Sequence, residues 1–87
     1  MSFDEASFKE KLESQHDFPG PYIFKFIAPI GQKHEVLAIL PEGASIKFRE
    51  SANSKYISIT VEAVMQTSDD IIAVYLEAST INDVIAL

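Results

Sequence analysis

The sequence predicts a small α+β domain, because segments with two different apolar repeats alternate along its 87 residues. Residues 22–28 and 55–63 place an apolar side chain at every second position, as half-buried strands do. Residues 67–79 instead repeat apolar side chains at helical spacing, behind hydroxyl residues that can cap a helix. A chain of this length makes one domain, residues 1–87, with a thin core, since a domain this small buries roughly 60–65% of its unfolded surface.

The composition excludes several classes of protein. Apolar residues make up 47% of the chain, too many for a disordered protein, and the absence of cysteine excludes disulfides and thiolate metal sites. A net charge of −6 opposes binding to nucleic acid and to anionic membranes. No apolar run approaches the ~20 residues that span a bilayer, and the acidic N-terminal segment does not resemble a signal peptide. We therefore expect a soluble cytoplasmic protein.

The first two elements are a helix and a strand. Residues 2–16, within an N-terminal extension of residues 1–17, are expected to form a short helix. In the strand at 22–28, one face carries the side chains that we assign to the core: Tyr22, Phe24, Phe26 and Ala28. The other face carries Lys25, and an unpaired buried ammonium is costly. We therefore expect that face of the sheet to be open to water or to a partner.

The middle of the chain predicts a short helix and a second strand. The helix covers Gly31–Leu40 and has two to three turns at most. The strand covers residues 45–50, with Ile46 and Phe48 directed inward. A turn at 51–54 follows, as its small polar residues indicate.

The remaining segments complete a βαββαβ order behind the extra N-terminal helix. Residues 55–63 form the clearest strand, residues 67–79 a helix and residues 84–87 a last short strand. This order predicts a ferredoxin-like sandwich, in which two helices lie on one face of a four-stranded antiparallel sheet.

In that arrangement, polar side chains of three strands meet on the open sheet face. They are Lys25, Lys47, Arg49, Tyr56, Ser58, Thr60 and Glu62, with Lys55 at the start of the third strand. This face can dock an acidic protein or a second copy of the sheet, or it can be merely solvated. RNA binding is not expected, because the central strands offer one outward aromatic residue, Tyr56, and lack the glycine–aromatic signature of the RNA-binding modules.

Four segments carry a resemblance to a known family: FPGPYIFKFI, YISITVEA, TSDDIIAVYLEAS and the closing INDVIAL. In order and spacing the chain resembles the YbeD-like family of small bacterial proteins of unknown function. The resemblance covers about half of the chain and implies a ferredoxin-like fold comparable to the ACT regulatory domains, which bind amino acids and associate into pairs. The chain departs from the family where the helix at Gly31–Leu40 is about a turn shorter.

The ACT likeness directs attention to Gly31, in the loop after the first strand. In ACT domains a glycine there lets backbone N–H groups approach an amino-acid ligand, and a helix N-terminus attracts carboxylates. A glycine in a strand–helix loop is also common for backbone freedom alone.

No set of residues predicts catalysis or a cofactor. His16 and His34 are read as surface residues without ligands at metal spacing, and Asp69 and Asp70 as acids of a helix N-terminus. We predict a non-enzymatic regulatory or interaction domain that acts through its open sheet face or by self-association. The alternative is a sensor of an amino acid or another small carboxylate.

Overall fold

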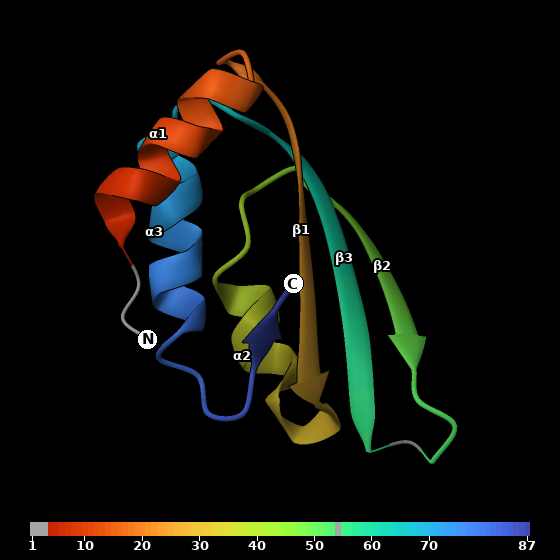
Figure 1. The fold of residues 1–87 in the computed structure, drawn as a ribbon. Coiled ribbons are helices and arrows are strands. Elements are labelled where there is room, and N and C mark those ends of the chain that lie inside the picture. Colours follow the sequence, from red (N-terminus) through yellow and green to blue (C-terminus); the bar gives the residue numbers. More distant parts are fainter. Residues whose placement is uncertain (1–3, 54) are drawn as a thin grey trace.

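Helices cover one face of a four-stranded antiparallel sheet in the computed structural model, which describes residues 4–53 and 55–87 (Figure 1). The elements in chain order are α1 (Glu5–Gln15), β1 (Gly20–Pro29), the 3₁₀ helix η1 (Ile30–Gln32), α2 (Lys33–Ala38), β2 (Ser45–Glu50), β3 (Tyr56–Met65), α3 (Ser68–Ala78) and β4 (Ile85–Ala86). The strands lie in the order β2-β3-β1-β4. The predicted α+β class is confirmed, and the arrangement is consistent with a ferredoxin-like fold.

The two long strands β1 and β3 form the centre of the sheet. They pair in antiparallel register over ten residues, from Gly20↔Met65 to Pro29↔Tyr56. Because side chains alternate along a strand, this register gives the pair one helix-facing side and one open side. Phe24 is fully buried on the helix side and Lys25 is exposed on the other, so the predicted division of β1 into two faces is confirmed.

The N-terminal helix α1 is capped and packs through one face. Asp4 is its N-cap and accepts a hydrogen bond from the Ser7 N–H at 3.2 Å. Leu12 is buried in the core, and Phe8 lies against that core on the same face. The first residues of the predicted helix, 2 and 3, lie outside the described residues.

The helix α3 begins where the sequence indicates. Its N-cap is Thr67, whose hydroxyl accepts a hydrogen bond from the Asp70 N–H at 3.2 Å. Polar contacts tie this end to α1: the Ser68 hydroxyl donates to the Glu13 carboxylate at 2.8 Å, and Lys9 pairs with Asp69 at 3.2 Å. The helix then buries Ile71, Ile72, Val74 and Ala78 against the sheet and its neighbours.

Phe48 faces the helix layer as predicted, but this side of β2 is not fully covered. Phe48 pairs with the buried Ile59 and therefore faces the helix layer, yet it is 45% exposed. The helix that should cover it, α2, has only six residues, so β2 extends past the covering layer. The Lys33 ammonium lies 4.4 Å from the centre of the Phe48 ring and supplies part of the missing contact.

The C-terminal strand is shorter than predicted. A strand was expected over residues 84–87, but β4 contains two residues, which pair with Phe26 and Ile27 of β1. One further bond runs from the Leu87 N–H to the Lys25 carbonyl at 2.8 Å. Asp83, just before β4, adopts the left-handed φ of 62° that turns the chain onto the sheet.

Two phenylalanines allow a matched test of this packing. Phe24→Ala should lower the free energy of unfolding by about 3–5 kcal/mol, because it leaves a cavity in the core. Phe48→Ala should cost about 1 kcal/mol or less, since that ring is half exposed and loses mainly a cation–π contact. Chemical denaturation of both variants measures the difference. Equal losses at the two positions would show that β2 is covered.

Two glycines allow a second matched test. A Cβ added to Gly20 would stand 2.5 Å from the Asp17 carbonyl oxygen, whereas a Cβ at Gly31 would meet nothing within 4 Å. Gly20→Ala should therefore destabilise the protein by about 1–3 kcal/mol through a backbone clash. Gly31→Ala should stay within about 0.5 kcal/mol of the parent in the same denaturation experiment. A neutral Gly20→Ala variant would contradict the tight turn between α1 and β1.

Candidate binding surface

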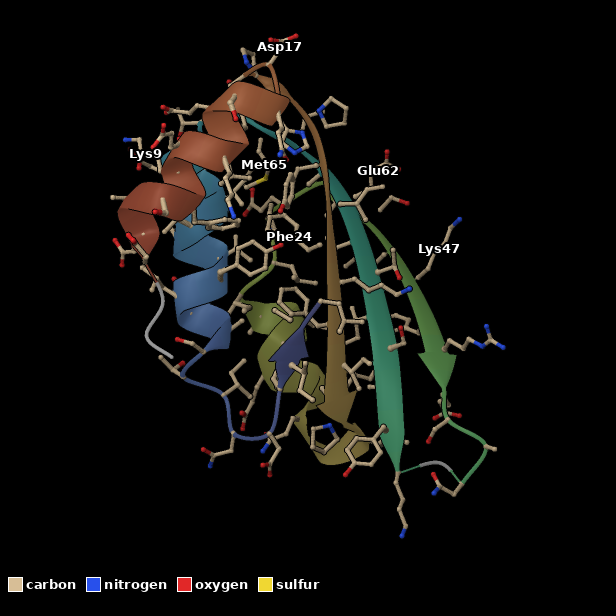
Figure 2. The ribbon with its side chains drawn as sticks, viewed as in Figure 1. Lys9, Asp17, Phe24, Lys47, Glu62 and Met65 are labelled. Atoms are coloured by element: carbon tan, nitrogen blue, oxygen red, sulfur yellow. The ribbon has the colours of Figure 1, made fainter. Side chains whose placement is uncertain are left out.

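The pairing register brings the predicted basic residues together across the helix-free side of the sheet. Thr60 of β3 stands between Lys25 of β1 and Lys47 of β2, so the two lysines share one row. We define the open sheet face as nine outward side chains of these three strands: Ile23, Lys25, Ile27, Lys47, Arg49, Tyr56, Ser58, Thr60 and Glu62. Figure 2 shows Lys47 and Glu62 on this side, and Phe24 and Met65 on the helix side.

A second row crosses the sheet next to the first. Ser58 stands between Ile27 and Arg49, and Tyr56 follows along β3 with 49% of its surface exposed. Ile27, Arg49, Tyr56 and Ser58 line a shallow depression of about 210 Å³ at this end of the face. The structure thus gathers three predicted site residues, Arg49, Tyr56 and Ser58, around one hollow.

The open sheet face differs in charge from the rest of the molecule. It carries Lys25, Lys47 and Arg49 against one acid, Glu62, whereas the chain has 13 acidic and 7 basic residues. Most of the acids lie on the helices and loops. The salt bridge found among the described residues, Lys9–Asp69, lies between α1 and α3, so the bases of the open sheet face remain available to a partner.

Exposed apolar side chains border these bases. Ile23 is 60% exposed beside Lys25, and Val64 and Ile85 are similarly open. The register places Ile85 of β4 opposite Ile27, at the other flank of the lysine. The two-residue repeat of β1 predicts part of this apolar border, because it places Ile23 and Ile27 on the same face as Lys25.

Two predicted residues lie at the end of the sheet. Lys55 is exposed, and its carbonyl accepts a hydrogen bond from the Ile30 N–H at 3.1 Å, which brings the β2–β3 connection next to η1. The connection is tied by the Ser51 hydroxyl, which donates to the Asn53 side chain at 2.8 Å; residue 54 of the predicted turn lies outside the described residues. Gly31 is exposed in η1 with open space around its Cα, so the ligand role of Gly31 stays a prediction.

A second hollow lies on the helix side and was missed by the sequence analysis. It is a cleft of about 500 Å³ between α1, α3 and β4, and its wall is largely apolar. Phe8, Tyr22, Tyr75, Leu76, Val84 and Leu87 are among its lining residues. Inside it the hydroxyls of Tyr22 and Tyr75 lie 3.0 Å apart in a hydrogen bond. No local pattern indicates this cleft, because residues of four separate elements, α1, β1, α3 and β4, create it by packing.

The two histidines occupy different environments. His34 is exposed as predicted, but His16 is half-buried, with its ring edge-on to Tyr22 at 5.3 Å between ring centres. The reading of His16 as a surface residue is therefore wrong, because the end of α1 folds back over β1. Within residues 4–53 and 55–87 no three potential ligands cluster as a metal site would require, and no helix is long and apolar enough to cross a membrane.

Comparison with known families gives one match. The family described as a protein of unknown function (DUF493) matches residues 13–87, which include every strand and the helices α2 and α3. No curated protein and no solved structure shows significant similarity to the chain. The expectation of an uncharacterised family of small proteins is confirmed, whereas the YbeD-like assignment and the ACT likeness stay predictions.

The tyrosine pair predicts a pH dependence. Burial in the cleft, together with the hydrogen bond to Tyr22, raises the pKa of Tyr75 above its ordinary value of 10.0. Because the folded-state pKa is raised, the stability linked to it is fully present below pH 10 and is lost as the pH rises further. Phenolate absorbance should show one late-titrating tyrosine that disappears from the titration in Tyr75→Phe. An unchanged late titration in that variant would contradict the assignment.

Proposed function

The chain belongs to the DUF493 family, whose function is unknown, and we propose that it is a non-enzymatic interaction domain that binds an acidic protein through its open sheet face. The observation that carries this proposal is the concentration of Lys25, Lys47 and Arg49 on a sheet side that none of the described helices covers, in a protein of net charge −6. A basic patch on an acidic protein steers acidic partners to one side of the molecule.

The composition of this face fits protein recognition. Its three cations are exposed without an ion pair to any described residue, and exposed Ile23 and Tyr56 add apolar area beside them. Aromatic residues and arginine are the side chains that protein interfaces favour. A partner with carboxylates among apolar residues would therefore satisfy both parts of the surface.

Self-association is the second form of this proposal. A two-fold dimer through the open sheet face would set the same three cations against each other, and like charges across an interface cost affinity. We therefore favour an acidic partner over a second copy on this face. The small-molecule sensor has less support, because a Cβ at Gly31 would meet nothing within 4 Å, so the glycine lies in open space and not in an enclosed pocket.

Charge reversal on the open sheet face tests the proposal. Lys25→Glu combined with Arg49→Glu should abolish capture of the binding partner from a native lysate, because two reversals subtract four charges and take the net charge from −6 to −10. Quantitative mass spectrometry of the captured proteins gives the measurement. The melting temperature should stay near that of the parent, because exposed charges contribute little to stability.

The matched control carries the same charge change on the helix side. Lys9→Glu combined with Lys11→Glu also gives −10, but these residues lie on α1. Capture should survive in the control and weaken with added salt in the parent. Capture that survives both double reversals would show that the open sheet face is merely solvated. Sedimentation of the parent over a range of concentrations tests self-association separately.

A further inference from the structure

The two sides of β1 are paired to very different extents. All ten residues of β1 are in register with β3, but on the other side of β1 the strand β4 pairs only with Phe26 and Ile27, and the Leu87 N–H adds one bond to the Lys25 carbonyl. Figure 1 shows β4 beside the C-terminal half of β1 and no strand beside the N-terminal half. Among the described residues, the segment Gly20–Phe24 therefore has no strand on that side.

The hydrogen-bond pattern identifies which backbone groups this edge offers. The Leu87 N–H donates to the Lys25 carbonyl, so the backbone groups of Lys25 point toward β4 and away from β3. In an antiparallel ladder this direction repeats at every second residue. The N–H and C=O of Ile23 consequently face the unpaired edge, and Pro21, which has no N–H, stands at the next such position. A strand added here would exchange a pair of hydrogen bonds with Ile23.

The large cleft adjoins this edge on the helix side. Tyr22 from the unpaired segment and Leu87, directly after β4, both line it together with Tyr75 of α3. Side chains of an added strand that lie opposite Tyr22 and Phe24 would point to the helix side and enter this apolar space. The next residue, opposite Ile23, would point to the open side, diagonally across from Lys25, within reach of a long side chain.

We propose that the N-terminal half of β1 binds an extended peptide segment of a partner protein as an additional strand, with apolar residues in the cleft and an acidic residue beside Lys25. Three features select this occupant. The backbone groups of Ile23 at the unpaired edge suit an extended chain, the cleft favours apolar side chains at alternate positions, and the Lys25 ammonium complements a carboxylate between them. The site is on the sheet edge, so it goes beyond the function proposed for the open sheet face and is tested independently of it.

A synthetic probe tests the proposal. We would use a short capped peptide of alternating valine and glutamate and follow the backbone amides of the whole protein by NMR. The expected result is saturable shift changes at Tyr22, Ile23 and Phe24, with hydrogen exchange of the Ile23 amide slowed by about tenfold near saturation. The same peptide methylated on the backbone nitrogen of its central glutamate should not bind, since it cannot donate to the Ile23 carbonyl.

Two proline variants locate the binding edge. Ile23→Pro removes the N–H that faces the unpaired edge and leaves the β1–β3 bonds in place, so the peptide should bind about tenfold more weakly. Phe48→Pro is the matched control on the opposite sheet edge: Ser51 donates to the Tyr56 carbonyl, so the Phe48 N–H points away from β3. Binding should be unchanged in that variant. Loss of binding in Phe48→Pro alone would place the peptide on β2 and overturn the proposal.

Other outcomes also decide the question. Equal binding of the methylated peptide would overturn strand addition, and this comparison does not depend on whether Ile23→Pro folds. A peptide with lysine in place of glutamate should bind more weakly, and equal affinity would overturn the acidic assignment. Protection of the Ile23 amide without peptide, rising with protein concentration, would mean that a second copy of the chain occupies the edge, which contradicts the proposed partner.

Discussion

The rest of the structure depends on the antiparallel pairing of β1 with β3. Ten residues of each strand are in register, and the pair gives the sheet one side of Phe24, Phe26, Ile59 and Val61, all fully buried, and one side of polar residues. A shift of one residue would exchange the two sides, so burial of the aromatic residues holds the register in place. The same register puts Lys25 and Lys47 on either side of Thr60. The core and the candidate surface are therefore two consequences of one pairing.

Coverage of this central pair is incomplete in two places. On the helix side, α2 has six residues and leaves Phe48 half exposed at the β2 edge. In the plane of the sheet, β4 has two residues, so the N-terminal half of β1 pairs with β3 on one side and has no described strand on the other. A small domain has too few residues to cover every edge and face of its sheet. Unpaired edges and open clefts are places where a partner can bind. The two sheet edges thus differ. The edge at β1 and β4 has an apolar cleft beside it, whereas at the β2 edge the Lys33 ammonium lies over the Phe48 ring.

The charges separate in the same direction as the layers. Several acids have structural roles on the helices. Asp4 caps α1, and Glu13 accepts a hydrogen bond from Ser68 between α1 and α3. Asp69 and Asp70 lie in the first turn of α3, where the helix dipole stabilises negative charge. Four of the seven basic residues, Lys25, Lys47, Arg49 and Lys55, lie on the sheet or directly beside it. The protein therefore has a basic surface although its net charge is −6, and the net charge alone does not indicate which charged partners that surface attracts.

Local pattern was sufficient for much of the architecture. The two-residue repeat of β1 and β3 determined their faces, and Thr67 with its following aspartates determined where α3 begins, because strand alternation and helix capping act within a few residues. The exposure of Phe48, the half-burial of His16 and the length of β4 depended on how far distant elements extend, which no short window contains. The Tyr22–Tyr75 pair and its cleft join residues 53 positions apart. Sequence by itself therefore determined which side of the sheet is basic, and only the tertiary structure decided which backbone edge and which cleft remain uncovered, since coverage is a property of whole elements packed together.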